Sequence, residues 1–246
     1  MKRILHAFFM CQSMFCAIPC PCRVWDEDAR PLMLPMLPLV GLEIGALWAF
    51  LGWLTGFLGL PVLVRGLILA LWPYLVTGFL HLDGFMDVTD AVKSSRDLQR
   101  RREILKDSHV GSFAVIGLCM LMLAQFGVFA SIPSDKNCLV LLFLPAVSRC
   151  GSALAVTALP SMSTSQYASQ KKPTALLAAI TAMLCLFVAL GFLLCRRMGF
   201  ALVGCMAGYA LALQRGFRSL EGMNGDIAGY ALTISELCGA AVFALM

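Results

Sequence analysis

The sequence predicts an all-α, polytopic membrane protein, a transmembrane helical bundle of about seven spans. Of the 246 residues, 60% are hydrophobic and only 13% are charged. Several apolar stretches reach about 20 residues, the length at which a helix crosses a bilayer. These stretches lack the period-2 alternation of membrane strands and are too long to be strands of a barrel. We therefore treat residues 1–246 as one integral-membrane domain.

The first element, 1–31, precedes the first span. It begins like a secretory signal, with Lys2 and Arg3 ahead of apolar residues, but polar residues interrupt the run and no cleavage motif follows. Pro19 and Pro21 favour the end of an amphipathic helix at the membrane interface, followed by a polar loop.

The remaining elements are spans separated by polar segments. Each span is a continuous apolar run, such as GLILALWPYLVTGFL in the second and ALLAAITAMLCLFVALGFLL in the fifth. The longest polar segment between spans, 91–109, is predicted to be a cytoplasmic loop. The predicted spans are 36–59, 66–86, 110–131, 138–159, 174–194, 199–214 and 228–246.

Basic residues predict the orientation of the bundle. If the N-terminus is cytoplasmic, most Lys and Arg residues fall on the cytoplasmic side, as membrane proteins prefer. The other side receives Arg65, Lys136, Arg196 and Arg197, and Arg149 lies inside a span. An odd number of spans then places the C-terminus outside. The net charge of +5 is explained by topology, and nucleic acid is not an expected partner.

The motif HLDGFMDVTDA, 81–91, carries three acids at the end of the second span. Asp83, Asp87 and Asp90 follow at i, i+4 and i+7, which places them on one helix face. Three like charges repel one another, so a bound divalent cation explains their presence better than a solvated helix end. We predict that these three residues bind Mg²⁺, which prefers carboxylate oxygens. Gly84 allows a ligand or a second helix to approach the backbone closely.

The loop after this motif adds charges of both signs. Glu103 and Asp107 are spaced i, i+4, with Lys106 and Ser108 beside them. The basic run 100–102 alone is typical of a stop-transfer or lipid-headgroup cluster. Acids ringed by cations suit Mg²⁺ together with the phosphate oxygens of a diphosphate, so 91–109 is the predicted catalytic loop.

Further polar residues belong to the spans. Asn224 and Asp226 lie at the mouth of the last span, on the predicted cytoplasmic side, and Glu236 lies about ten residues deeper. A lone buried Glu is costly unless it is paired or protonated. Arg149 either forms a structural ion pair with Glu236 or reaches a substrate phosphate, and both interpretations stay open. Glu43 is a third candidate for this pair.

Six segments together carry a family resemblance: IPCPCRVW, PLVGLEIG, HLDGFMDVTDA, EILKDSHVGSFAVIGL, AVSRCGSAL and NGDIAGYALTISEL. In this order, along nearly the whole chain, they resemble the cobalamin synthase (adenosylcobinamide-GDP ribazoletransferase) family. The positions that match are His81, Asp83, Gly84, Asp87, Asp90, Glu103, Lys106, Asp107, Ser108, Gly111, Arg149, Gly225, Asp226 and Glu236.

The resemblance implies the last assembly step of coenzyme B12. α-Ribazole, or its 5'-phosphate, attacks the phosphate of adenosylcobinamide-GDP that is joined to the corrinoid arm, and GMP leaves with Mg²⁺ assisting. It implies a multi-pass protein of the bacterial cytoplasmic (inner) membrane with its active site facing the cytoplasm. Glu103, Lys106, Asp107, Arg149, Asp226 and Glu236 are then the expected catalytic residues. His81, Gly84, Arg96, Ser108 and Asn224 are the expected substrate-binding residues.

The chain departs from the family pattern at a few positions. Ala91, Val92 and Lys93 replace common glycines, Ser169 replaces an Arg, and Thr233 replaces a common Glu, which affects the expected nucleotide and ribazole contacts.

Three other functions share some of these features. An intramembrane prenyltransferase needs a second Asp-rich helix, and a CDP-alcohol phosphotransferase needs an Ala-Arg and two more acids after Asp-Gly. An ion transporter needs acids at the midplane of several helices. Whether identical subunits assemble into a homo-oligomer is left open.

Overall fold

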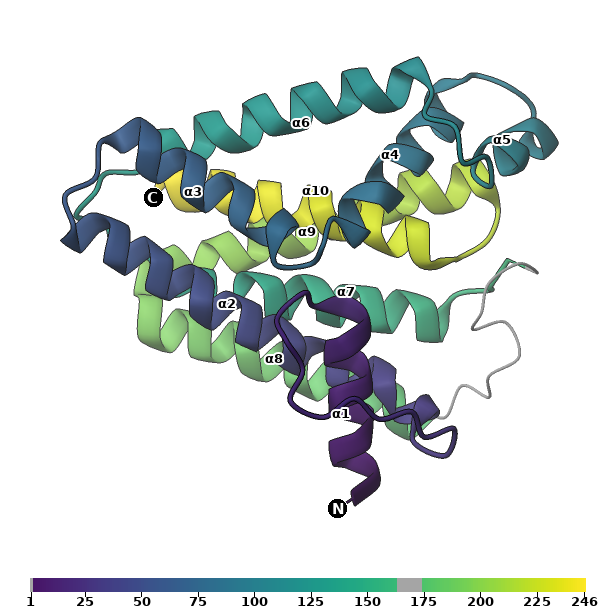
Figure 1. Cartoon of the computed structure of the whole chain (residues 1–246), viewed down its shortest axis with the longest axis horizontal. Coiled ribbons are helices and arrows are strands. Elements are labelled where there is room, and N and C mark those ends of the chain that lie inside the picture. Colours follow the sequence, from purple (N-terminus) through teal and green to yellow (C-terminus); the bar gives the residue numbers. More distant parts are fainter. Residues whose placement is uncertain (1, 163–173) are drawn as a thin grey trace.

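Figure 1 shows the computed structural model, which describes residues 2–162 and 174–246. The described residues form helices, and one isolated bridge pairs Ser161 with Met223. Ser169 lies outside the described residues. The α-helices are α1 (Lys2–Phe15), α2 (Met33–Phe57), α3 (Val62–Leu75), α4 (Leu80–Lys93), α5 (Leu98–Ile104), α6 (Ser112–Ala130), α7 (Leu144–Ala158), α8 (Thr174–Cys195), α9 (Phe200–Leu220) and α10 (Gly225–Leu245). Short 3₁₀ turns at Arg30–Leu32, Leu139–Leu142 and Arg196–Gly199 precede α2, α7 and α9.

The all-α membrane bundle is confirmed. Five segments among the described residues are long and apolar enough to cross a membrane, and one of them, Thr174–Leu220, has 47 residues and contains both α8 and α9. Figure 1 shows α8 and α9 running in opposite directions, so they are two crossings. With α3 and α4 counted as one bent span, the bundle has the expected seven or so crossings.

The predicted span 66–86 is not one straight helix. Its two halves, α3 and α4, meet at 85°. Gly78 and Phe79, at the break, have φ values of +57° and +64°, a left-handed conformation that glycine adopts at little cost. Pro73, just before the break, has no N–H to donate within the helix. Apolar content predicted a continuous span here, and Gly78, Phe79 and Pro73 explain why it bends.

The N-terminal helix α1 is a packed part of the bundle as well as an amphipathic helix. Its buried face, which includes Met10, Cys11 and Gln12, packs against α2. The backbone N–H of Ala17 donates to the carbonyl of Val76 at the α3–α4 break, over 2.7 Å. Figure 1 shows α1 lying across α2. The N-terminus is therefore attached to the broken span.

The helices α6 and α8 bury little of their surface inside the protein. Only 22% of the most apolar window of α6 is buried, and 17% of the window within Thr174–Leu220. Exposed side chains such as Met120, Leu123 and Leu193 face outward. Apolar surface of this extent is what lipid-facing helices require.

Candidate active site

The three predicted acids lie on α4, and a fourth joins them from α10. Asp87 is half-buried, and the charges of Asp83, Asp226 and Asp90 all act on it. Asp226 is in turn influenced by Asp83. Figure 1 shows α4 and α10 side by side. Two helices far apart in the sequence therefore supply one group of carboxylates.

Gly84 allows α4 and α10 to approach this closely. A Cβ at Gly84 would lie 2.9 Å from the backbone oxygen of Asp226 and 3.0 Å from its Cα. Any larger residue would push the two backbones apart. The prediction that Gly84 permits a close approach is confirmed, with a second helix as the partner.

Asn224 fixes the start of α10. Its side-chain oxygen accepts from the N–H of Ile227 over 3.0 Å, a standard N-cap, and its amide nitrogen donates to Asp226 over 2.6 Å. Asn224 was expected to bind substrate, and the structure places it as a residue that orients the Asp226 carboxylate.

A small pocket of about 20 Å³, here called the acid pocket, lies between α4 and the start of α6. Asp90 borders it and accepts a long hydrogen bond from the N–H of Ala114, over 3.4 Å. A Cβ at Gly111 would collide with the Asp90 carboxylate, so any other residue there would displace that carboxylate. The pocket has room for a water-sized species but not for a substrate. It is lined by Asp83, Met86, Asp87, Asp90, Ile104, His109, Val110, Gly111 and Ala114.

The donors of the acid pocket suit Mg²⁺ held jointly with a substrate. Within the described ranges, no three His, Cys, Asp or Glu side chains converge closely enough to hold a metal ion by themselves. The reason is that positions i and i+7 lie roughly 10 Å apart along a helix. Asp83 and Asp90 therefore do not meet at one ion, whereas Asp87 lies between them. Mg²⁺ usually takes one or two carboxylates and completes its shell with water and phosphate oxygens, which fits this arrangement.

The loop acids Glu103 and Asp107 have partners of their own. Glu103 accepts from Arg100 over 2.8 Å and from Gln99 over 3.3 Å, and these contacts hold the pKa of its carboxyl below the usual range. Asp107 accepts from the backbone N–H of His109 and contacts its ring, which lowers the pKa of Asp107. Neither acid lines the acid pocket. Lys106, Ser108 and Arg96 are exposed beside or before them.

His109 lines the acid pocket, and the sequence analysis missed it. Its Nδ1 lies 2.7 Å from Oδ1 of Asp107. The signal that could have found it is its place between Asp107 and Gly111, two residues that match the family pattern.

The basic run 100–102 fastens the loop to α9. Arg102 donates to the carbonyls of Leu220 and Glu221 over 3.0 and 2.9 Å, and Arg101 donates to Ser219 over 3.3 Å. These carbonyls end α9, where cations are favourable. All three arginines thus bind protein, since Arg100 donates to Glu103, where the run alone is typical of a lipid-headgroup cluster. Arg101 and Arg102 position the turn that leads into α10, the helix that carries Asp226.

A second cavity, here called the α1 cavity, has a volume of about 370 Å³ and lies beside the acids. Asp226 lines it, and the backbone of Asp226 packs against Gly84, which is next to Asp83 of the acid pocket. The cavity and the acid pocket are therefore neighbours. The lining residues are Met14, Phe15, Leu34, Leu37, Leu80, His81, Ser152, Val156, Gly225, Asp226, Ala228 and Gly229.

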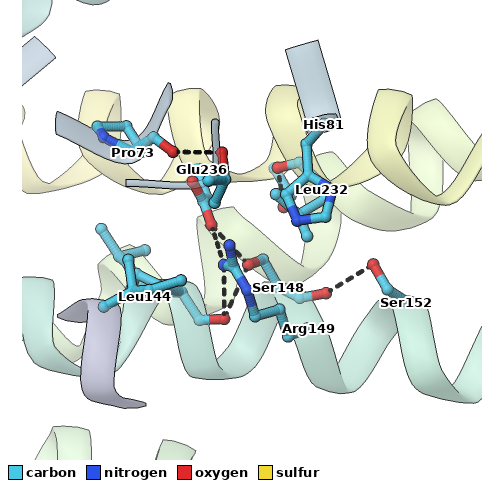
Figure 2. Close-up of polar contacts among 12 residues, drawn as sticks. Pro73, His81, Leu144, Ser148, Arg149, Ser152, Leu232 and Glu236 are labelled. Atoms are coloured by element: carbon cyan, nitrogen blue, oxygen red, sulfur yellow. Dashed lines mark hydrogen bonds and ion pairs between the residues drawn. The ribbon is translucent and has the colours of Figure 1, made fainter. Parts of the chain in front are cut away.

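Arg149 and Glu236 form a buried ion pair. Nη1 of Arg149 lies 2.9 Å from Oε1 of Glu236, and the same oxygen accepts from Ser148 over 2.8 Å. Figure 2 shows this pair between α7 and α10, with the His81 ring nearby. The structure favours the ion-pair interpretation of Arg149. Glu43 does not join the pair: it accepts from Gln12 over 3.0 Å.

Thr233, where a Glu is common in the family, ties α10 to α4. Its hydroxyl donates to the backbone oxygen of His81 over 3.3 Å. The substitution therefore retains a polar contact at the site.

A larger cavity of about 760 Å³ lies away from the acids, between α2 and the segment before α7. Phe50, Trp53 and Phe57 line it, and all three are well exposed. Trp residues are typical of the membrane–water boundary, and none of the acids of α4 or α10 lines this cavity.

The fold and the site define a class: a polytopic membrane protein with carboxylates on two packed helices, one of which, Asp226, borders a cavity of small-molecule size. The family model described as "Cobalamin-5-phosphate synthase" matches residues 7–244. The adenosylcobinamide-GDP ribazoletransferase of Clostridium botulinum (strain Alaska E43 / Type E3) is 34% identical, with 97% of each chain covered. The enzyme of the same name from Clostridium perfringens (strain 13 / Type A) is also 34% identical, with 97% of each covered. The one from Geobacillus thermodenitrificans is 32% identical over 79% of this chain and 76% of its own. No solved structure matches.

The chain belongs to the cobalamin-5-phosphate synthase family. It is accordingly a membrane-embedded transferase of the final step of cobalamin synthesis.

Proposed function

We propose that this chain joins adenosylcobinamide-GDP to α-ribazole, or to its 5'-phosphate, and releases GMP in a Mg²⁺-dependent reaction. An acceptor oxygen forms a bond to the phosphorus on the corrinoid arm, and the bond from that phosphorus to the GMP oxygen breaks. The relatives named adenosylcobinamide-GDP ribazoletransferase support the choice of substrates.

One observation carries the proposal: Asp226, which lines the α1 cavity, packs through its backbone against Gly84, which lies between Asp83 and Asp87 of the acid pocket. Transfer at a diphosphate requires charge neutralisation and alignment more than a strong nucleophile. When bound, Mg²⁺ supplies that neutralisation. Asp87 is the central ligand in this proposal, with Asp83 and Asp90 on either side of it along α4.

Asp226 is the carboxylate placed to receive the proton of an attacking hydroxyl. It lines the α1 cavity and lies close enough to interact electrostatically with Asp83. Glu103 and Asp107, the alternatives from the sequence, line neither the acid pocket nor the α1 cavity. We therefore assign the proton-accepting role to Asp226.

The other functions considered from the sequence fit less well. A prenyltransferase needs a second Asp-rich helix, but α10 contributes only Asp226 to the acid group. A transporter needs acids at mid-depth in several helices. Glu236 is deep in α10, but it is neutralised by Arg149.

The proposed location is the bacterial cytoplasmic membrane, with the acid pocket facing the cytoplasm. The support is the distribution of Lys and Arg along the chain, which favours a cytoplasmic N-terminus.

The experiment is an assay of the purified protein in detergent with adenosylcobinamide-GDP and α-ribazole, with and without Mg²⁺. We expect GMP release that requires all three components. A folded protein that releases no GMP under these conditions would overturn the proposal.

A further inference from the structure

We propose that the α1 cavity is the binding pocket of the nucleoside acceptor, and that His81 is one of its specificity-determining residues. The base of the nucleoside lies among apolar side chains of α1 and α2, and its ribose faces His81, Ser152 and Asp226. This inference rests on the proposed function and adds where the acceptor binds and what recognises it.

The volume of the α1 cavity suits the nucleoside substrate and not the corrinoid substrate. Small-molecule pockets range over roughly 300–1,000 Å³, and about 370 Å³ is at the lower end of that range. A nucleoside with a flat base is of this size. A corrinoid ring with its nucleotide arm is several times larger and does not fit inside.

The lining is divided in the way that a nucleoside requires. Met14 and Phe15 of α1 and Leu34 and Leu37 of α2 form an apolar side, which suits the faces of an aromatic base. The polar side consists of His81 of α4, Ser152 of α7 and Asp226 of α10. These can hydrogen-bond to ribose hydroxyls, which carry both donors and acceptors.

His81 has an unused hydrogen-bonding atom. The residue is only 9% exposed, and its Nε2 is buried without a partner among the described residues. Buried polar atoms are rarely left unpaired in a folded protein. Because His81 lines the cavity, a ligand in the cavity is the natural partner for Nε2.

The ring and the backbone of His81 are each held by one contact. The Phe15 ring stacks on it, with centroids 6.3 Å apart and an interplanar angle of 15°. Its backbone oxygen accepts from Thr233 on α10. Figure 2 shows the ring pointing from α4 toward α7, the helix that carries Ser152. A preset ring of this kind gives specificity at little entropic cost.

Asp226 links the bound acceptor to the chemistry. It is a lining residue of the α1 cavity and acts on Asp83 and Asp87. A ribose held at the polar side therefore presents its hydroxyl, or a phosphate on it, toward the acids. The corrinoid substrate approaches the acids from outside the cavity.

The test places a larger side chain in the α1 cavity and compares its effect with that of the same substitution elsewhere on α7. Val156 and Val147 are both buried on α7, but Val156 lines the α1 cavity and Val147 lines an apolar crevice between α7, α8 and α9. We expect Val156→Phe to raise the KM for α-ribazole about tenfold or more and to leave the KM for adenosylcobinamide-GDP unchanged. Val147→Phe should change neither.

His81 is tested by two substitutions. His81→Leu removes the hydrogen bond, and we expect about a tenfold loss of α-ribazole affinity, whereas His81→Gln retains a polar atom and most of the affinity. Equilibrium dialysis of α-ribazole against the purified, full-length variants measures this without turnover. A protein that binds α-ribazole but releases no GMP would overturn the proposed function and leave this inference standing.

Two outcomes would overturn the pocket assignment. One is a folded Val156→Phe variant that binds α-ribazole as tightly as wild type. The other is a selective rise in the KM for adenosylcobinamide-GDP in that variant.

Discussion

Arg149 donates to Glu236 over 2.9 Å, and these two side chains are only 1% and 5% exposed. The pair joins α7 to α10, and Ser148 adds a hydrogen bond to the same carboxylate oxygen. Removing one member of a buried pair leaves a charge without compensation, which costs about 3–5 kcal/mol.

Breaking this pair should therefore destabilise the bundle. We expect Glu236→Ala to lower the free energy of unfolding by about 3–5 kcal/mol, measured by denaturation in detergent. The double variant Arg149→Met with Glu236→Met should recover much of the loss, because no charge stays buried. Glu103→Ala, which breaks an exposed pair with Arg100, is the control and should unfold like wild type. A fully stable Glu236→Ala variant would contradict a structural role.

Activity of the same double variant separates the two interpretations of Arg149. If the pair is structural, the folded double variant keeps turnover within a few-fold of wild type. A loss of several hundred-fold in a folded protein would indicate that Arg149 binds a substrate phosphate.

The carboxylates of α4 should be indispensable. Asp83→Asn and Asp87→Asn keep the shape of each side chain but remove its charge, so we expect a loss of about 100-fold or more in GMP release. Raising the Mg²⁺ concentration should partly restore the activity of at least one of these two variants. Glu103→Gln, outside the acid pocket, should stay active. Near-normal turnover in both Asp variants would remove these carboxylates from the mechanism.

Two glycines at opposite ends of α6 make a matched test of the acid pocket. A Cβ at Gly111 meets the Asp90 carboxylate, whereas a Cβ at Gly127 on α6 meets nothing within 4 Å. Gly111→Ala should displace Asp90 and lower GMP release about tenfold or more without unfolding the protein. Gly127→Ala should be as active as wild type. Equal activity in the two variants would mean that the position of Asp90 is unimportant.

The orientation in the membrane can be tested at Met246. An odd number of crossings from a cytoplasmic N-terminus places the C-terminus outside. A periplasmically active reporter fused after Met246 should be active there, and a reporter that folds only in the cytoplasm should be silent. The opposite pattern would contradict the count of crossings.

Local signals in the sequence predicted those parts of the site that lie on one element. The spacing of Asp83, Asp87 and Asp90 predicts one helix face, and α4 has it. The only basic residue within a predicted span, Arg149, was paired with Glu236 in one of two interpretations. Hydrophobic length predicted the bundle, because membrane helices must satisfy their own backbone hydrogen bonds.

Relations between elements were harder to predict. The i, i+4 spacing of Glu103 and Asp107 predicts a shared helix face, but α5 ends at Ile104, before Asp107, and neither acid lines the acid pocket. Hydrophobicity averaged over a window of residues does not reveal the break at Gly78, because one glycine changes the average little. The packing of α1 against the α3–α4 break, and hence the α1 cavity, depends on contacts between distant residues such as Ala17 and Val76.

The walls of the α1 cavity come from both extremes of the chain. Phe15 belongs to α1, which is synthesised before the other described helices, and Asp226 belongs to α10, which is synthesised after them. The cavity is therefore complete only once α10 has been made and has packed against the earlier helices. A chain interrupted before α10 lacks one wall of the cavity.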